Sequence, residues 1–215
     1  MTRLVDLSMP LSGRTIPVPG HPAPRFEPLH TLERDGVRNT TMTISLHTGT
    51  HVDAPFHFIS DGETIDRIPL DRFRRRGLLV DLTGATPGAP IDLPALEAGG
   101  FDPGAVRDAI LVLSTGWTDR AFESEALYME NPYLGHDAAR AVAAARPSAL
   151  GLDFAVDRAR PWPNHTVLLE AGVLLIENLM GLQALPAHGF VVTALPLFLI
   201  GENGAPARVV AEVPS

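Results

Sequence analysis

His47-Thr-Gly-Thr-His51-Val-Asp53-Ala-Pro-Phe-His57 is the stretch that carries the strongest structural signal in this sequence. Its three histidines and one aspartate are separated by even intervals, so in extended backbone their side chains would all point to the same side. The residues between them are mostly β-branched or apolar and suit a core-facing side. A helix cannot explain the pattern, because Asp53 would leave the face shared by His47 and His51. Pro55 would also break the helix.

A straight strand does not bring these side chains together. At about 3.3 Å per residue, His47 and His57 would lie about 33 Å apart. Ligand atoms lie about 2.0–2.2 Å from an ion such as zinc, so the chain must fold back sharply if the side chains share one. Gly49 and Pro55 stand where such turns are needed. The cluster predicts a site for Zn²⁺, Mn²⁺ or Fe²⁺; the alternative is a polar strand whose histidines only make hydrogen bonds.

The composition narrows the function classes. A chain of 215 residues fits one domain with a sizeable core. There are no cysteines, which excludes disulfides and thiol nucleophiles, and the formal charge of −8 argues against nonspecific binding to nucleic acid. No apolar run approaches the roughly 18 residues that span a bilayer. The first residues do not resemble a secretory signal, so we expect a cytoplasmic protein without membrane contact.

Predicted strands and helices intermingle along the sequence, which favours a single mixed α/β domain over residues 1–215. Residues 1–30 are rich in proline and glycine and predict an irregular arm that packs against the body or lies at an oligomer interface. An alanine-rich helix is expected over residues 136–145, ending before Pro147. The predicted strands are residues 4–7, 40–46, 78–82, 109–113, 149–154, 173–177, 190–195 and 208–212.

A second cluster of polar residues follows about 110 residues downstream. Asn164 is a good N-cap and Gly172 a good helix stop, so residues 165–171 predict a short helix and residues 173–177 a buried strand. A helix in one direction and a strand back could bring His165 and Glu177 together. By itself this pair is a weak signal. The alternative is an exposed histidine in a first helical turn and a charge at a strand end.

The eleven-residue motif matches every fixed position of HxGTHxDxPxH, the signature of the cyclase family that includes bacterial kynurenine formamidases and isatin hydrolases. The resemblance extends over nearly the whole chain, since His165 and Glu177 keep the family's twelve-residue interval and the Val18-Pro19-Gly20 turn is also similar. It implies a metal-dependent hydrolase with a compact, swivelling β/β/α-type fold. It also implies a homo-oligomer, either a dimer or a tetramer.

The same resemblance implies roles for individual residues. His47, His51 and Asp53 would bind one metal ion. Asp53 would bridge to a second ion held by His165 and Glu177. His57 would then be left as the general acid and base. The ions implied are one or two Zn²⁺, with Mn²⁺ as the other choice.

The chemistry follows from general properties of such sites. Zn²⁺ lowers the pKa of water to about 7, and the hydroxide could attack an amide, lactam or ester carbonyl. His57, with an ordinary pKa of about 6.5, could take up a proton and return it to an amine leaving group. No Gly-x-Ser-x-Gly turn is present for a serine route.

Aromatic side chains are candidates for a pocket that accepts a flat ring, although each could equally be core. We expect Phe58 and Trp117 to contact substrate, and Phe56 to face the core. Arginines 72–76 are expected on a solvated face. The aromatic candidates are Phe56, Phe58, Trp117, Tyr128, Tyr133 and Trp162.

Three functions stay open at this point. The first is hydrolysis of a C–N bond in an aryl formamide or cyclic amide, with substrates like N-formylkynurenine, as in tryptophan catabolism, or like isatin. His21 and the Phe154-Ala155-Val156-Asp157 stretch depart from the formamidase pattern, which leaves the exact substrate open. The second is a cyclase, dehydratase or lactonase of natural-product metabolism that uses the same metal site. The third is a catalytically idle metal-binding scaffold.

Overall fold

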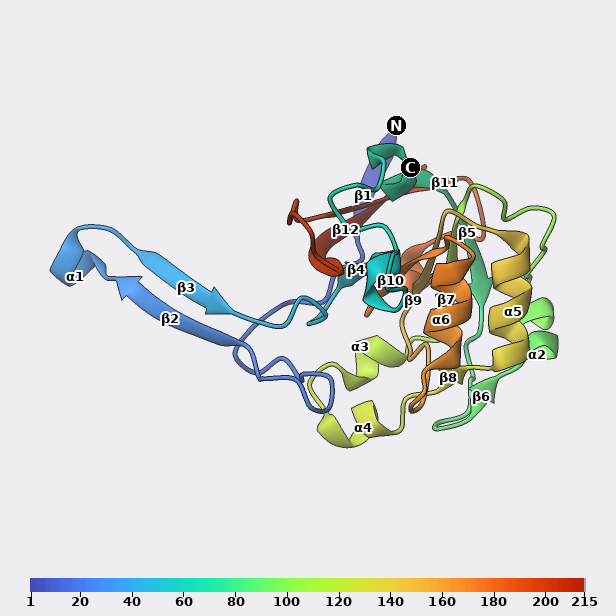
Figure 1. The fold of residues 1–215 in the computed structure, drawn as a ribbon, viewed down its shortest axis with the longest axis horizontal. Helices are drawn as coiled ribbons and strands as arrows, with labels where there is room; N and C mark the ends of the chain where they lie inside the picture. The colour runs from blue at the N-terminus through green and yellow to red at the C-terminus, as the bar shows by residue number, and fades with distance from the viewer. Residues whose placement is uncertain (215) are drawn as a thin grey trace.

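A sheet of eight strands forms the centre of the computed structural model, which describes residues 1–214 (Figure 1). The strand order is β1-β12-β11-β5-β7-β9-β10-β4, and β4 pairs with β12 as well. Seven of the strands therefore close into a barrel, with β1 added outside β12. The strands are β1 (Thr2–Asp6), β4 (His51–Asp53), β5 (Arg74–Asp81), β7 (Ile110–Ser114), β9 (Ala149–Leu152), β10 (Leu174–Glu177), β11 (Phe190–Pro196) and β12 (Gly204–Pro214).

Parallel pairing joins β5, β7, β9 and β10 in that order, whereas the other pairs in this sheet are antiparallel. Helices α2 (Leu93–Ala98), α5 (His136–Ala145) and α6 (Pro163–Glu170) cover the outside of the parallel strands (Figure 1). Alternation along β7 places Ile110 and Val112 inside the barrel and Leu111 and Leu113 against the helices. The core thus has two parts, one inside the barrel and one between the barrel and the helices.

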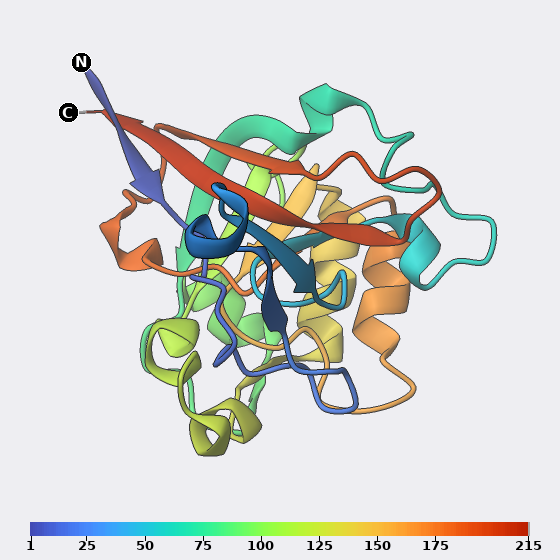
Figure 2. The same ribbon diagram turned by 90° about the vertical axis from the view of Figure 1, so that its left-hand side faces the viewer.

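A long hairpin projects from the body, away from the helices (Figure 1), and points toward the viewer in Figure 2. Its strands are β2 (Arg25–His30) and β3 (Asn39–Thr43), joined through the short helix α1 (Leu32–Asp35). The shorter elements on the body are α3 (Trp117–Ala121), α4 (Glu125–Met129), the 3₁₀ turns η1 (Pro55–His57), η2 (Leu70–Phe73) and η3 (Leu182–Ala184), and the paired strands β6 (Pro90–Ile91) and β8 (Tyr133–Leu134).

The prediction of one mixed α/β domain is confirmed, and α5 has the predicted bounds. The arm agrees with the prediction only in part. The strand expected at residues 4–7 is present as β1, which pairs with β12, whereas the end of the arm is not irregular and projects as one side of the hairpin. The predicted strand over residues 40–46 ends at Thr43 and pairs with β2 rather than with the barrel. Alternation indicates extended backbone but carries no information about the partner strand.

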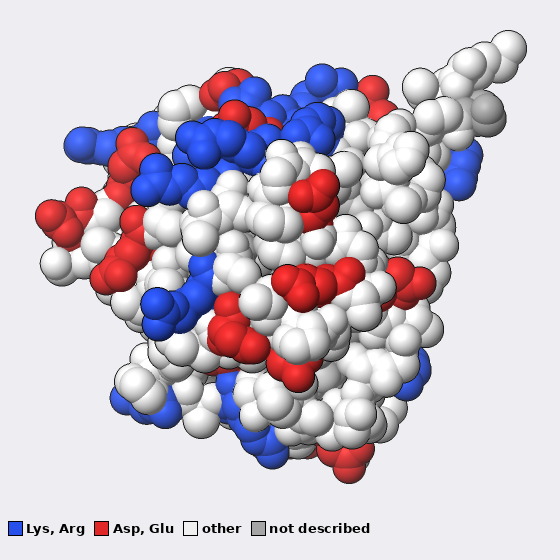
Figure 3. Space-filling model, turned by 90° about the vertical axis from the view of Figure 1, so that its right-hand side faces the viewer, with Lys and Arg blue, Asp and Glu red and all other residues white. Residues whose placement is uncertain are grey.

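The basic run at residues 72–76 is only partly the solvated face that the sequence predicts. Arg74 and Arg76 are exposed, and Figure 3 shows arginines gathered along the upper part of the face that carries α2 and α5. Arg72 instead turns inward, and its guanidinium donates to the carbonyls of Ser148 and Gly172. None of the helices within residues 1–214 has the length and apolar character needed to cross a membrane.

Candidate metal and active site

The eleven-residue motif folds back on itself by three different local structures. His47 lies in an irregular turn, Gly49 follows with a φ of +66°, and only His51–Asp53 is a strand. A side chain at Gly49 would be strained at this φ and would overlap Leu11, so glycine is required there. Pro55 then starts the 3₁₀ turn that ends at His57. The rings of His47 and His57 stack with their centroids 3.9 Å apart, which confirms the predicted reversal.

Asp53 lies at the centre of this turn and is buried. Its Oδ1 is 2.8 Å from Nδ1 of His47 and 3.1 Å from Nε2 of His51. The other ring nitrogens are held from behind, His51 Nδ1 by the Gly49 carbonyl at 2.8 Å and His47 Nε2 by Oδ1 of Asn203 at 2.6 Å. Fixing one ring nitrogen so that the other faces inward is the arrangement that metal-binding histidines use.

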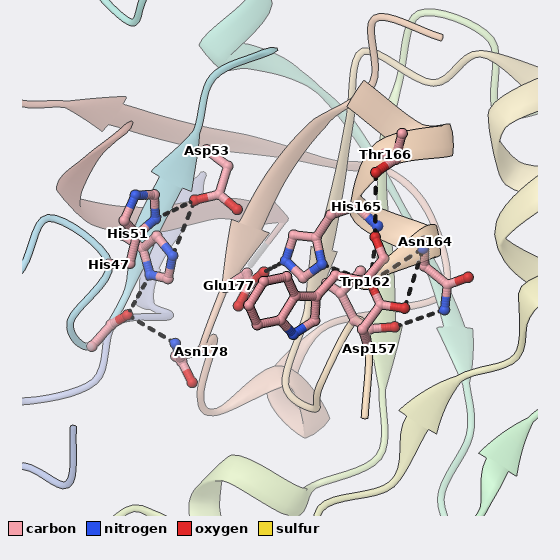
Figure 4. A network of polar contacts seen from close by, with 12 residues as sticks. His47, His51, Asp53, Asp157, Trp162, Asn164, His165, Thr166, Glu177 and Asn178 are labelled. Carbon is pink, nitrogen blue, oxygen red and sulfur yellow. Dashed lines mark hydrogen bonds and ion pairs between the residues drawn. The ribbon is translucent and has the colours of Figure 1, made fainter. Parts of the chain in front are cut away.

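The second cluster comes from α6 and β10, as the sequence predicts. Glu177 ends β10 directly opposite His51 of β4, because these strands pair antiparallel. His165 donates or accepts at both ring nitrogens, with Nδ1 2.7 Å from Asp157 and Nε2 3.0 Å from Glu177 (Figure 4). The parallel strands β9 and β10 end at this place. Polar sites commonly lie outside the carboxyl ends of parallel strands.

Two sets of three side chains can each present ligand atoms within 4.8 Å of one another. One set is His47, Asp53 and His57, and the other is His51, Asp53 and Glu177. Asp53 belongs to both sets. Its Oδ2 is buried, with no hydrogen-bond partner among the described residues, and such an atom calls for an ion or a water. Imidazole and carboxylate donors with one orphaned oxygen fit a divalent metal.

Without a metal ion, the negative carboxylates of the site are compensated by protonated histidines. Burial disfavours ionisation of Asp53, but His51 and His47 hold its pKa well below the usual range. Burial also opposes the charging of two histidines, yet Asp53 raises the pKa of His51 to about 9, and Asp157 with Glu177 raises the pKa of His165 to about 10. Protons therefore occupy nitrogens that a metal would need, so protons and metal compete for them.

A cavity of about 220 Å³ opens onto these side chains. Phe58 and Trp162 form an aromatic wall, with centroids 6.0 Å apart at an interplanar angle of 85°, and Phe58 stacks on His165 at 4.7 Å. Tyr128, from α4, lines the cavity too, and burial together with Glu177 raises the pKa of its phenol to about 12. A flat, mainly apolar group fits this space.

Two aromatic predictions are wrong. Trp117 does not line the cavity: it starts α3, is 3% exposed within the core, and its indole nitrogen donates to the Leu127 carbonyl at 3.2 Å. Trp117 was expected in a pocket because it follows the end of a strand. The helical turn that begins at Trp117 instead rotates its ring into the core. Phe56, expected in the core, is 40% exposed because η1 interrupts the alternation of the strand.

Helix α6 begins differently from the prediction. It starts at Pro163, and Asn164 lies inside it, where its amide donates to the carbonyls of Leu134 and Val156. The cap comes instead from the Asp157 carboxylate, which accepts from the backbone amides of Asn164 and His165. Asp157 therefore both caps the helix and orients His165.

The sequence did not indicate four of the polar residues that contribute to the site. Asp157 and Asn203 hold histidines by hydrogen bonds, whereas Asn131 and Asn178 line the cavity. A carboxylate eight residues before His165 was the only available signal for Asp157. Asn203 is brought in by β12, whose Gly204 leaves room for His47, since a Cβ there would lie 2.9 Å from Cε1 of the ring.

The profile of the family described as "Putative cyclase" matches residues 5–158, most of the chain. The chain belongs to this cyclase family. A kynurenine formamidase from Salinibacter ruber is 29% identical over 212 residues, covering 96% of each chain. Isatin hydrolase A from Labrenzia aggregata, bound to benzyl benzoate, superposes with a TM-score of 0.86 at 27% identity and covers 100% of this chain and 94% of its own. A potential metal-dependent hydrolase with cyclase activity superposes at 0.80, with 26% identity and full coverage of both chains.

Membership of the cyclase family confirms the resemblance seen in the motif. Likeness over the full length of these relatives also confirms the predicted fold type. The family's motif supplies every residue of the two ligand sets that share Asp53 except Glu177. A divalent metal is therefore the cofactor that both the donor set and the relatives favour.

Proposed function

We propose that this protein is a metal-dependent hydrolase that cleaves the C–N bond of an aryl formamide or a cyclic amide, such as N-formylkynurenine or isatin. The observation that carries the proposal is the position of Asp53, shared by two ligand sets at an aromatic-walled cavity beside His57. The relatives named as kynurenine formamidase and isatin hydrolase support the same substrate class. Zn²⁺ is the preferred ion, in one or two copies, with Mn²⁺ as the alternative.

We assign His47, His51 and Asp53 to one metal ion, and Asp53, His165 and Glu177 to a second. Such ions supply Lewis acidity, acidifying water and polarising a carbonyl group. These two groups differ from the ligand sets described above. Contacts of Asp53 with His47 at 2.8 Å and with His51 at 3.1 Å support the first group, whereas His165 joins the second through Glu177 at 3.0 Å. Asp157 and Asn203 keep the ring nitrogens of His165 and His47 turned inward.

The remaining residues of the cavity position the substrate and move its proton. Phe58 and Trp162 lie nearly perpendicular to one another, so one contacts the face of the aromatic ring of the substrate and the other its edge. Burial, which Asp53 opposes only in part, lowers the pKa of His57 to about 4, so its ring is neutral at pH 7. A neutral ring nitrogen of His57 can accept a proton as water adds to the carbonyl and return it to the departing nitrogen.

The proposal is tested by elemental analysis and turnover of the same purified sample. Protein loaded with Zn²⁺ or Mn²⁺ is assayed with N-formylkynurenine and isatin, and products are identified by mass. We expect hydrolysis of at least one substrate and its loss in Asp53→Asn together with bound metal. Asp61→Asn, a matched change on the surface, should behave as wild type. Failure of every formamide, lactam and ester would refute the proposal, and ring closure would favour the cyclase alternative.

Two further parts of the proposal concern the oligomeric state and the cellular location of the enzyme. We propose a homo-oligomer, a dimer or tetramer, in which the projecting hairpin contacts a second copy. Apolar side chains on the hairpin support this, since Phe26 is 39% and Met42 47% exposed, and an isolated two-stranded ribbon is marginally stable in water. A cytoplasmic location is the second part, and cell fractionation tests it.

A further inference from the structure

The cavity at the candidate metal site does not end at Trp162. A second cavity of about 360 Å³ adjoins it, and the two share six lining residues. The inner cavity, at about 220 Å³, is smaller than the roughly 300–1,000 Å³ of typical small-molecule sites. A substrate with a side chain on its ring would therefore extend into the outer cavity. The shared residues are Val18, Tyr128, Asn131, Ala155, Asp157 and Trp162.

Two arginines line only the outer cavity, Arg158 and Arg160. The guanidinium of Arg160 lies 4.6 Å from the ring centre of Trp162, and that of Arg158 lies 5.8 Å from the ring centre of Tyr133. Nη1 of Arg158 also donates to the Gly88 carbonyl at 3.1 Å. Stacking and this hydrogen bond hold the two guanidinium groups in place, which lowers the entropy lost when they bind a ligand.

Neither arginine has a carboxylate partner within residues 1–214. Asp157 is the acidic residue that lines the outer cavity, but His165 and two backbone amides already occupy its oxygens. The outer cavity is therefore lined by two cations that have no carboxylate partner among the described residues. Planar guanidinium groups bind carboxylates well, often through two parallel hydrogen bonds.

We propose that Arg158 and Arg160 form a subsite for a carboxylate carried on the side chain of the substrate, an inference that rests on the proposed hydrolase function. The aromatic ring and its amide occupy the inner cavity beside Phe58, and the side chain passes Trp162 to reach the arginines. The preferred substrate is then an open-chain aryl formamide with an acidic side chain. A compact neutral ring such as isatin leaves the subsite empty.

The test uses two substrates that differ only in charge, 4-(2-formamidophenyl)-4-oxobutanoate and its primary amide. Wild-type protein should show a kcat/KM about tenfold higher for the acid, as two partly exposed ion pairs allow. The double variant Arg158→Met with Arg160→Met should lose this preference by lowering kcat/KM for the acid alone. High salt should reduce the preference in the wild type. Arg140→Met on α5, an exposed arginine outside both cavities, should change neither value.

Equal rates for acid and amide in the wild type, or an unchanged preference in the double variant, would overturn the subsite while leaving the hydrolase function intact. If neither substrate is cleaved, the proposed function fails, and a binding measurement then tests the subsite separately. Metal-loaded protein is then titrated with 4-oxo-4-phenylbutanoate and its amide by calorimetry. Tighter binding of the acid that disappears in the double variant supports the subsite. Tighter binding that persists in the variant assigns the carboxylate to the metal and overturns it.

Discussion

His57 is the residue whose two possible roles lead to different measurements. It stacks on His47, and it also lies close enough to Asp53 to complete a ligand set. We expect His57→Gln to lower kcat by about 10²–10⁴-fold, the range for loss of a general acid–base, with bound metal unchanged. Kinetics and elemental analysis on one sample measure both, and the exposed His188→Gln is the control. Loss of metal in the His57 variant would make this residue a ligand instead.

Asp153 provides a test of the electrostatics near the site. Its buried carboxylate accepts from the amides of Thr115 and Gly116, but burial dominates and raises its pKa from 3.8 to about 6. The folded state therefore binds this proton more tightly than the unfolded state. The contribution of Asp153 to the free energy of unfolding should fall as pH rises from about 4 to about 6, by up to about 2–3 kcal/mol, and then stay constant.

Urea unfolding of wild type and Asp153→Asn across pH 4–8 isolates this contribution. The wild type should lose stability relative to the variant across that window, because only the wild type carries the titrating carboxyl. A difference that does not change with pH would contradict the raised pKa. Titration of the carboxyl carbon by NMR gives the folded-state pKa independently.

Individual residues of the site were predictable where the reason was local. His47, His51 and Asp53 lie within seven positions, so the sequence itself limits their separation, and the turn at Gly49 could be expected. Asn203 could not be expected, because it reaches His47 only through the pairing of β12 with β4, 156 positions away. Trp117 was predicted wrongly for a related reason. The rotation of a helix about its axis depends on packing that the sequence does not encode locally.

At the level of secondary structure, the residue that caps helix α6 also orients a histidine of the candidate metal site, so the stability of the protein and the geometry of the site depend on the same side chain. Asp157 accepts from the backbone amides of Asn164 and His165 and also holds the ring of His165. We expect Asp157→Asn to lower the free energy of unfolding by about 1 kcal/mol, the usual effect of a weakened cap. It should also lower metal affinity or activity about 10–100-fold, because the ring loses its orienting carboxylate. Denaturant unfolding and metal titration measure the two effects.

The N-terminal end of α5 offers the matched control. Asp137 accepts from the amides of Ala138 and Leu93, so Asp137→Asn weakens a comparable contact far from the cavity. This variant should lose stability while keeping metal affinity and activity. If the Asp157 variant also loses only stability, then Asp157 is a cap and no more.

Elements were predictable to the extent that their hydrophobic pattern was complete. The strands of the core and α5 carry clear patterns, and the structure has elements at each of those positions. The projecting hairpin illustrates the limit. A strand was predicted over residues 40–46, which overlaps β3, but its partner β2 contains Pro28 in a proline-rich segment that suggested irregular backbone. Pairing requires two strands, and only the segment of β3 had a sequence pattern that predicted a strand.

For the whole molecule, the hairpin predicts how copies assemble. Phe26 and Met42 face each other across β2 and β3, so replacing both with serine removes apolar surface without touching the barrel. We expect this double variant to shift the protein from an oligomer to a monomer in sedimentation experiments, with an unchanged far-UV spectrum. Leu70→Ser, which removes an exposed leucine from the body, should not. A monomeric wild type would contradict the proposal directly.

The closing strand of the barrel also bears on how the protein is made. β12 pairs with β1, β4 and β11, and Asn203 just before it holds His47. During translation, the barrel can close only after the ribosome has released residues 204–214, although the eleven-residue motif emerged some 150 residues earlier. Strand β10 is made before β12, so until then the motif can pair on one side only and lacks β12. A nascent chain without β12 also lacks the contact of Asn203 with His47, so it should hold a divalent metal more weakly than the folded protein.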